Sequence, residues 1–360
     1  MLNQILDLNL NEKGRRIINS IVWEGTDVTN DISNDIISLT GTDSINEFDT
    51  VDLEMENRDG RWYKSWAPKI GETIVFNYTL VNWEYPGIQS YDVGKFYIDD
   101  VQYNGPPDKV TVKTISVDSS STILEEKKNR VWEKVTLEKV AKDIAEANGI
   151  ELIYDCDYNR EYSRLEQQLE SDISFLKKTT KELGINVKLY NDRLVLFEED
   201  KYTKKEPILV LNREDLKSYS FSQDNTNMYQ KCTISYFDSR LKKKIEVTYT
   251  AKGDKGAKRA NKRTLFIDEQ KAPPGKTKEQ KESYLLEVAK KELEEKRKHA
   301  INGDITILGR VQPITNGDVI QILGFGEYEG KYIVENVNTD YTSFTLSLKM
   351  RKIAEEESDE

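Results

Sequence analysis

The sequence predicts a mainly β protein of the α+β class, in which two β-barrel domains flank a small α/β module and one long helix is inserted in the second barrel. Runs rich in Val, Ile, Thr, Tyr and Trp recur in both parts of the chain, and segments with 3.6-residue apolar periodicity lie between them. A chain of 360 residues with 37% hydrophobic content can also bury more than one core. We expect domains at 1–118, 119–200 and 201–352, followed by an acidic tail at 353–360.

The first domain is predicted to contain at least six short strands. The strand-like runs are SIVWEG, IISLTG, TVDLEMEN, ETIVFNYTLVNW, GKFYIDDVQY and KVTVKTISV. Turn residues separate these runs, and NGPP from Asn104 to Pro107 predicts a tight turn because proline cannot donate to a strand ladder. Many short strands separated by such turns are typical of a barrel or a sandwich.

The central module is predicted from two helix caps. Thr136 can cap a helix that ends near Gly149, and the apolar positions of one face are Leu137, Val140, Ala141, Ile144 and Ala145. ELIYD follows as a strand. Ser171 or Asp172 can cap a second helix that stops at Gly184, with Ile173, Leu176 and Leu183 facing inward. NVKLY and RLVLFE then predict a hairpin.

The second β domain is predicted from strand-like runs that resume after residue 200. These runs are PILVLN, SYSFSQ, QKCTISYFD, KKIEVTYTA, GDITILG, DVIQIL, GKYIVENVN and SFTLSLKM. A loop at 253–276 and a helix at 277–299 interrupt them, and the helix begins at a capping box from Thr277 to Gln280. The similar size of the two β domains is consistent with an old duplication, which the sequence alone does not prove.

The residues that common catalytic sites require are scarce. The chain has one histidine, His299, and its two cysteines, Cys156 and Cys232, follow no metal or redox spacing. The glycines near Gly253 and Gly324 match turns rather than a phosphate-binding loop. We therefore expect no catalytic residue, no cofactor and no metal.

Charge and hydropathy narrow the expected partners. The net charge of −11 disfavours binding of nucleic acid or an anionic membrane over the whole surface. Apolar runs are too short to span a bilayer, so we expect no membrane insertion by this chain. The N-terminus does not follow the order of a signal peptide, which favours synthesis in the bacterial cytoplasm.

Two stretches carry a family resemblance. The first combines DGRWYKSWAPKIGETIVF with GKFYIDDVQYNGPPDKVTVKTISVD, and the second runs from EEKKNRVWEKVTLEKVAKDIAEANGIELIYD through YSRLEQQLESDISFLKKTTKELGINVKLYNDRLVLFEE. Together they resemble the phage late control protein D family, the baseplate hub of prophage-type contractile tails, which is similar in turn to the N-terminal part of type VI secretion spike proteins. The EQxxESDxxFL pattern at Glu166 to Leu176 is the most specific part, and the resemblance is looser beyond residue 201.

The resemblance implies a structural baseplate hub of a contractile phage tail or a phage-tail-like bacteriocin, with no enzyme activity. Such a hub is a homotrimer whose tube-type barrels form a pseudo-sixfold ring around a central channel and join the sixfold tail tube to the threefold spike. The implied partners are the tail tube protein, the central spike protein, the tape measure protein and other baseplate proteins, with DNA only in transit if the particle is a phage. The implied location is the baseplate of a virion tail or tail-like particle.

Eight residues are candidates for structural or interface roles. They are Trp62, Trp66, Glu166, Gln167, Ser171, Asp172, Phe175 and Leu176. Glu166 and Gln167 lie just before the second helix, where their side chains can satisfy exposed backbone groups.

Two alternative functions remain. A tail-associated cell-wall hydrolase or sugar-binding module would need a carboxylate pair, and Trp62 with Trp66 could form its platform, although packing beside the first β domain is favoured. A type VI or extracellular-injection spike component should carry a C-terminal needle. We see no needle repeats after Arg351 and expect spike and hydrolase functions on separate polypeptides.

Overall fold

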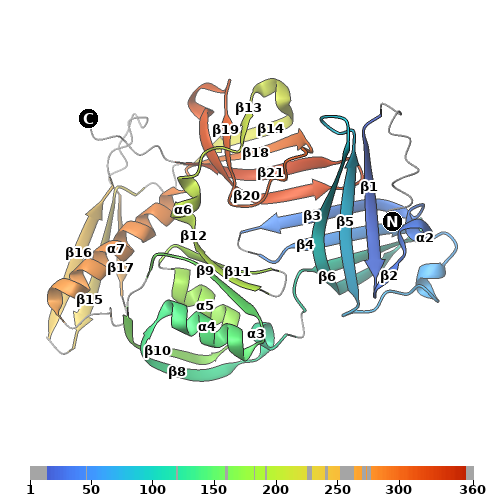
Figure 1. Cartoon of the computed structure of the whole chain (residues 1–360). Helices are drawn as coiled ribbons and strands as arrows, with labels where there is room; N and C mark the ends of the chain where they lie inside the picture. The colour runs from blue at the N-terminus through green and yellow to red at the C-terminus, as the bar shows by residue number, and fades with distance from the viewer. Residues whose placement is uncertain are drawn as a thin grey trace.

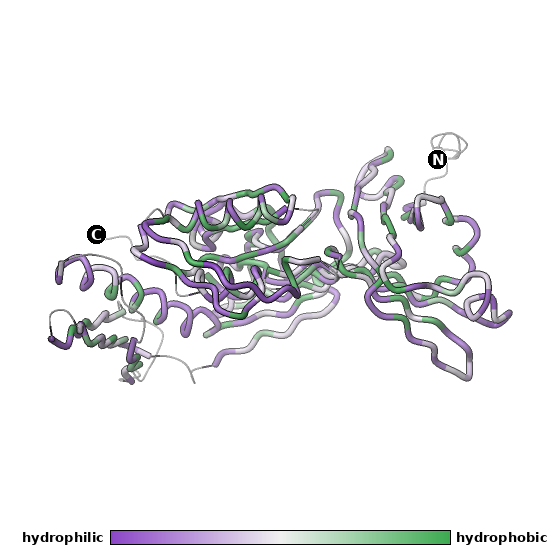
Figure 2. Tube along the Cα trace, turned by 90° about the horizontal axis from the view of Figure 1, so that it is seen from below, coloured by the Kyte–Doolittle hydropathy of each residue, from purple (hydrophilic) through white to green (hydrophobic). Residues whose placement is uncertain are grey.

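The computed structural model describes residues 14–353 apart from short internal gaps. The gaps are 46, 119–120, 159–160, 182, 191–192, 225–228, 240–241, 252–262, 270–272 and 274–276. Most of the expected loop at 253–276 therefore lies outside the described residues, as does most of the acidic tail, but within that loop Thr264–Asp268 form a strand. The described chain is mainly β and elongated, with the first β half at one end and a small helix-covered sheet at the other (Figures 1 and 2).

The first β half comprises the strands β1 to β7. Their bounds are β1 Arg16–Trp23, β2 Thr26–Asp27, β3 Ile36–Ser44, β4 Thr50–Glu56, β5 Thr73–Val81, β6 Ile88–Asn104 and β7 Lys109–Ile115, with the short helices α2 Thr29–Ile32 and η1 Arg61–Tyr63 between them. The strands pair in the order β3-β4-β7-β6-β5-β1. Alternate residues of β4, namely Val51, Leu53 and Met55, are fully buried, because successive strand side chains point to opposite faces.

The second β half comprises β13, β14 and β18 to β21. Their bounds are β13 Leu209–Leu211, β14 Leu216–Gln223, β18 Ile301–Leu308, β19 Val319–Ile322, β20 Gly330–Asp340 and β21 Thr345–Lys352, with η2 Arg213–Asp215 and η3 Gly326–Tyr328. The strands pair in the order β14-β18-β21-β20-β19-β13.

Apart from the two-residue β2, each strand of the first half has a counterpart in the second. Taken in chain order, β13, β14, β18, β19, β20 and β21 have the same pairing partners as β1, β3, β4, β5, β6 and β7. The long strand of each half is irregular at the same place, between Ile98 and Asp100 in β6 and between Val334 and Asn336 in β20. One difference is that β13 runs parallel to β19, whereas β1 runs antiparallel to β5. The pairing pattern supports the duplication that the sequence only suggested.

The two halves form one continuous 13-stranded sheet because β20 pairs with β3 (Figure 1). Among the described strands, no pairing closes either half into a barrel, so the expectation of two barrels is not confirmed. Each half is an open sheet that curls around its own core. In the first half, for example, Ile21 of β1 and Leu39 of β3 belong to one buried cluster although their strands lie far apart in the sheet.

The central module contains two small sheets and two main helices. Its elements are α3 Thr122–Glu125, β8 Lys128–Thr136, α4 Leu137–Ala147, β9 Glu151–Asp155, β10 Glu161–Glu170, α5 Asp172–Lys181, β11 Ile185–Tyr190, β12 Arg193–Glu198 and α6 Glu199–Thr203. Thr136 caps α4 by accepting from the Lys139 N–H, and all five expected inward residues of α4 are buried. The sequence did not predict β8 and β10, which pair with each other as an antiparallel ribbon.

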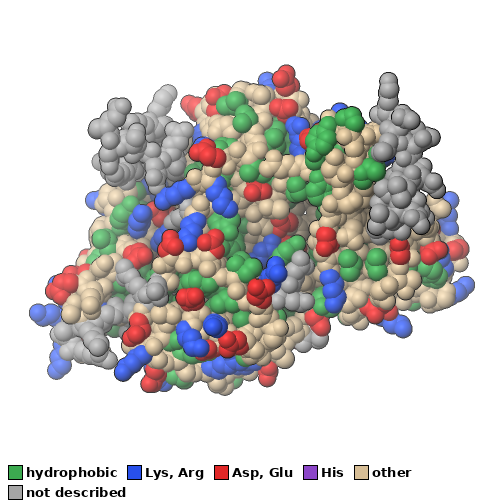
Figure 3. Space-filling model, viewed as in Figure 1, with side chains coloured by type: hydrophobic (Ala, Val, Ile, Leu, Met, Phe, Trp, Pro, Cys, Tyr) green, Lys and Arg blue, Asp and Glu red, His purple; other side chains and the backbone are tan. Residues whose placement is uncertain are grey.

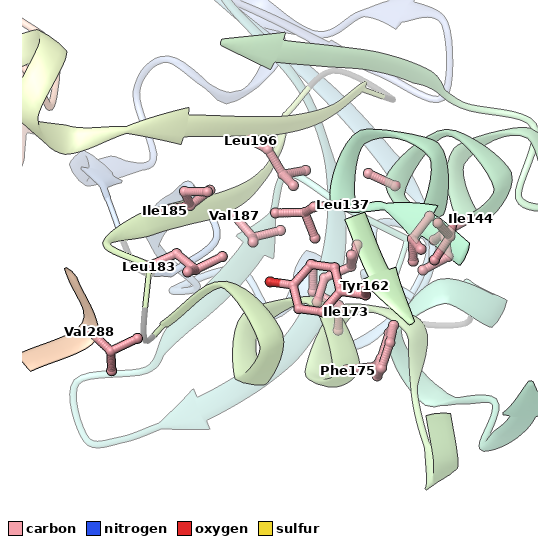
Figure 4. Packing of buried hydrophobic residues seen from close by; sticks show 14 of the residues in the cluster. Leu137, Ile144, Tyr162, Ile173, Phe175, Leu183, Ile185, Val187, Leu196 and Val288 are labelled. Atoms are coloured by element: carbon pink, nitrogen blue, oxygen red, sulfur yellow. The ribbon is translucent and has the colours of Figure 1, made fainter. Parts of the chain in front are cut away.

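The inserted segment differs from the expected architecture. β15 Lys231–Asp238, β16 Lys243–Thr250 and β17 Thr264–Asp268 form a separate three-stranded sheet, and α7 Lys278–Arg297 covers one face of it. The expected capping box from Thr277 to Gln280 is present. Because α7 buries this sheet, its residues join the hydrophobic cluster of the module rather than that of the second β half, and Val288 lies near Leu183 (Figure 4).

Candidate functional site

The junction between the two β halves begins with the pairing of β20 and β3. Residues 336–340 run antiparallel to residues 44–40, and the Asn338 side chain donates to Thr42 Oγ1 at 3.0 Å. Beside these strands lies a cavity of about 450 Å³ that residues of both β halves and of the module line. All three parts of the chain thus meet at this site.

A buried ionic cluster joins the three parts at this cavity. Lys188 of β11 places its Nζ 2.6 Å from Asp43 Oδ1 and 2.8 Å from Asp49 Oδ1. Asn316, in the loop before β19, donates its backbone N–H to Asp43 Oδ2 at 2.9 Å and its side-chain amide to Oδ1. Two carboxylates therefore share one lysine, with an amide from the second half beside them.

The two carboxylates of this cluster have opposite pKa shifts. Burial, together with the charge of Asp43, raises the pKa of Asp49 to about 7, and Lys188 only partly offsets this. Burial also acts to raise the pKa of Asp43, but Lys188 and Asn316 outweigh it and hold that pKa below its ordinary value. The pKa of Lys188 is raised because the two carboxylates outweigh its burial. Near neutral pH the cluster can take up one proton, mainly on Asp49.

Aromatic rings form the adjoining wall of the junction. Tyr78 of β5 lies 5.4 Å from both Tyr341 and Phe344 of the second half, measured between ring centroids. Trp83 Nε1 donates to the Gly309 carbonyl at 2.6 Å. Gly41 is required here, because a Cβ at this position would sit 2.8 Å from the Tyr341 ring.

The EQxxESDxxFL motif forms a second buried polar cluster, inside the module. The Asp172 side chain is fully buried and accepts from Lys128 Nζ at 2.7 Å, Asn148 Nδ2 at 2.9 Å and Gln167 Nε2 at 2.8 Å. Arg130 lies 3.5 Å away. Burial acts to raise the pKa of Asp172, but these hydrogen bonds and Arg130 hold it below its ordinary value. Asp172 therefore ties together β8, α4, β10 and α5.

The other motif residues also have structural surroundings. Ser171 rather than Asp172 caps α5, because the Ser174 N–H donates to Ser171 Oγ at 3.4 Å. Phe175 stacks on Trp132 at 5.4 Å, and Leu176 is fully buried. Gln167 also donates to the Glu170 carbonyl at 3.0 Å, as expected for a residue that satisfies backbone groups.

Three of the sequence candidates, Glu166, Trp62 and Trp66, lie outside the two buried polar clusters. Glu166 contacts Arg164 and Gln168 on the exposed side of β10 instead of a backbone group of the helix. Trp62 lies in the first β half, is fully buried, and contacts Trp66 edge to face at 5.7 Å. Sequence reasoning missed Asp43, Asp49 and Lys188, because no local pattern links a lysine on β11 to carboxylates about 140 residues earlier.

The described residues contain neither a metal-ligand cluster nor a membrane-spanning helix. Within the described ranges, no group of three or more His, Cys, Asp or Glu side chains is placed to hold a metal ion. Every described helix is too short or too polar to cross a bilayer. On the face drawn in Figure 3, acidic and basic side chains are mixed over both β halves and the module.

Comparison with known sequences relates the chain to phage baseplates. No family model matches it. Two relatives, each named probable baseplate hub protein, come from Escherichia phages P2 and 186 and are 25% identical over 226 and 269 residues. The matches cover 61% and 72% of this chain but only 56% and 66% of the relatives, so the chain spans less than two thirds of their length.

Comparison with solved structures shows the same fold in tail proteins. The 43 kDa tail protein of prophage MuSo2 from Shewanella oneidensis has a TM-score of 0.67 at 15% identity, over 93% of this chain and 98% of that one. A prophage tail protein from Listeria monocytogenes scores 0.61 at 9% identity, over 94% and 95%. An Escherichia coli component of the type VI secretion system scores 0.52 at 11% identity, over 89% and 74%. The resemblance found in the sequence is confirmed.

Proposed function

We propose that this chain is the structural baseplate hub of a contractile phage tail or a phage-tail-like bacteriocin, a trimeric adapter between the sixfold tail tube and the threefold central spike. The names of the P2 and 186 relatives support the hub assignment. The adapter role goes further than those names and rests on the architecture of this chain.

The observation that carries the proposal is the repeat of one β half by the other. The two halves share strand order and pairing and are joined edge to edge through β20 and β3. Three copies of the chain would therefore present six similar β halves but only three modules. Such a trimer can match a sixfold partner through its β halves and a threefold partner through its modules.

A central channel is supported by the polar face of the sheet. Register places a row of small polar side chains on one face of the sheet across the two halves: Ser218, Thr306, Ser347, Asn338, Thr42 and Thr50. Asp52 and Asp304 flank this row on the same face. Lys113 faces Asp52 and Lys349 faces Asp304, so the charges on this face are balanced. A polar wall without excess positive charge stays hydrated, so tape measure protein, or DNA in a phage, would pass without tight binding.

The described residues give the cell-wall hydrolase alternative less support. That alternative was motivated by carboxylates and by Trp62 with Trp66 as a sugar platform. Trp62 is fully buried, and its indole N–H donates to Asp35 at 3.1 Å, so its ring faces the core of the first half instead of a ligand. We therefore propose structural roles for all eight sequence candidates.

The oligomeric state of the purified full chain tests the proposal. We expect native mass spectrometry or light scattering to give three times the chain mass of 41.7 kDa. Purified protein that stays monomeric at all concentrations and in mixtures with tail tube protein would contradict the adapter. Release of reducing sugar from peptidoglycan, abolished by a single Asp or Glu substitution, would favour the hydrolase.

A further inference from the structure

Two exposed strand edges in the continuous sheet have no partner among the described strands. One is the outer edge of β14, which pairs only with β18. The other lies on β6, where β5 pairs with residues 88–97 but not with residues 100–104, whose only strand partner is β7. Gln102, Asn104, Ser220 and Ser222 on these edges are all exposed.

The β20–β3 junction inside the chain shows how two such edges pair with each other. β20 pairs with β19 through residues 330–333, and beyond its irregularity it offers residues 336–340 to β3 of the other half. β6 is the counterpart of β20 and β14 is the counterpart of β3 in the repeated strand order. The two unpaired edges are thus the counterparts of the two edges that join the halves.

The registers of the two halves align residue by residue. Asp52 faces Lys113 in the first half, as Asp304 faces Lys349 in the second. Lys113 faces Asp100 and Lys349 faces Asn336, each just after the irregularity of its long strand. On the other side of these aspartates, Thr40 of β3 faces Asp52, and Ser220 of β14 faces Asp304. Gln102 then corresponds to Asn338, Asn104 to Asp340, and Ser222 to Thr42.

We propose that residues 100–104 of one copy pair antiparallel with β14 of a second copy, so that the β20–β3 junction is repeated between chains. The alignment places Gln102 opposite Ser222 and Asn104 opposite Ser220. This pairing between copies, called the seam below, rests on the proposed trimer and identifies the surface through which its chains associate.

The chemistry of both edges suits a second copy of the chain. Natural edge strands usually carry charges, proline or a covering loop that prevents pairing, whereas β14 has Lys217 as its single charged residue. Within β14 the facing positions at the seam, Gln102 with Ser222 and Asn104 with Ser220, are neutral polar residues. Like charges meet only at one end, where Asp100 would face Asp224, one residue beyond β14. Tyr103 and Phe221 correspond to Thr339 and Gly41, which pair in the in-chain junction, and would meet on the core side of the seam.

The seam is a head-to-tail contact, because each copy offers β14 to one neighbour and β6 to the other. Such contacts form a ring if the rotation closes and a filament if it does not. Since the in-chain junction and the seam are equivalent, a ring of six β halves contains three chains and alternates the two junctions. At the opposite end of the sheet, β1 and the two-residue β2 beside it are not the mate, because β13, the counterpart of β1, does not join the halves.

Disulfide trapping tests the seam in the full chain. Facing residues of adjacent antiparallel strands have Cα atoms about 4.5 to 5.5 Å apart, within disulfide range. We expect Gln102→Cys with Ser222→Cys to give dimers and closed trimers on a non-reducing gel after mild oxidation. The matched control, Gln102→Cys with Asn302→Cys, moves one thiol from Ser222 to the residue that faces it one strand inward, to about 10 Å, and should give none. The parental chain controls for Cys156 and for the buried Cys232.

Measured mass separates failure of the seam from failure of the proposed function. A trimer by native mass spectrometry without trapping in the Cys pair would overturn the seam and leave the hub intact. A monomer at all concentrations with no trapped species would overturn both.

A charge exchange provides a second test that needs no oxidation. Asn104→Asp with Ser220→Asp places like charges across the seam and should raise the concentration at which half of the chains are assembled. Asn104→Lys with Ser220→Asp should restore assembly, because opposite charges then face each other. Equal assembly of the two double variants would argue against this pairing.

Discussion

The two buried carboxylate clusters of this chain use similar residues for different purposes. In the module, the single carboxylate of Asp172 has two cations, Lys128 and Arg130, and its pKa is lowered. At the junction, Asp43 and Asp49 share one cation, Lys188, and the pKa of Asp49 is raised to about 7. The first cluster fixes the fold of one part over a wide pH range, whereas the second links three parts and responds to pH near neutrality.

The largest loss of unfolding free energy is expected from Asp172→Asn. This substitution keeps the shape of the side chain but removes the buried carboxylate from Lys128, whose side chain is 14% exposed and keeps only the more exposed Glu126 at 3.5 Å. Breaking such a pair costs about 3 to 5 kcal/mol of unfolding free energy. Chemical denaturation measures the loss, and Glu161→Gln on the exposed face of β10 is the control, with an expected change of about 0.5 kcal/mol or less. A similar small change for Asp172→Asn would show that the cluster is not stabilising.

A somewhat smaller and pH-dependent effect is expected from Lys188→Met. Without the lysine, Asp43 and Asp49 repel each other, and we expect a loss of about 2 to 4 kcal/mol at pH 8. The loss should shrink at pH 5, because one carboxyl group can then take up a proton. Denaturation at both pH values, with the exposed Lys349→Met as control, measures the difference. Equal losses at pH 5 and pH 8 would contradict a shared lysine.

Gly41→Ala should disturb the junction by overpacking. The added methyl group would press on the Tyr341 ring, and such crowding costs about 1 to 3 kcal/mol. Gly14→Ala is the control, because that position has open space around it. Combining Gly41→Ala with Tyr341→Leu should recover part of the loss, and a strictly additive double variant would argue against this contact.

The smallest change in unfolding free energy at neutral pH is expected from Asp49→Asn. The folded-state pKa of Asp49 lies above its ordinary value of 3.8, so the folded chain binds this proton more tightly than the unfolded chain. The contribution of Asp49 to stability is therefore fully present at low pH and decreases as pH rises from about 4 to about 7. Asp49→Asn should flatten the stability profile in this window. An unchanged profile from pH 4 to pH 7 would assign the proton to another group.

Asp172 has the opposite pH dependence. Its pKa is lowered, so its contribution is present above the ordinary carboxyl pKa and is lost only as pH falls through the lower folded value. The profile of Asp172→Asn should therefore run parallel to that of the parental chain between pH 5 and pH 8.

Local signals in the sequence predicted the helices well. Thr136 and the capping box at Thr277 lie where the helices begin, because caps depend on residues three positions apart. The ribbon of β8 and β10 escaped prediction, since both strands are largely exposed and carry charged residues in place of apolar alternation.

Long-range features could not be predicted from one sequence. The separation of β15, β16 and β17 from the second β half depends on which face α7 covers, and strand patterns do not reveal that choice. The junction cluster is a similar case, because Lys188 lies on an alternating strand and its partners come from elsewhere in the fold. The EQxxESDxxFL motif is different, because the sequence shows it as a family resemblance and the structure shows it as a buried polar network in the module.

Cryo-electron microscopy of the purified particle tests the hub most directly. We predict three copies of this chain at the junction of tail tube and central spike, with six β halves in one ring. Residues 100–104 of each copy should lie beside β14 of the next, and the row from Ser218 to Thr50 should face the channel. Absence of the chain from that junction, or its presence there in any number other than three, would contradict the proposed hub.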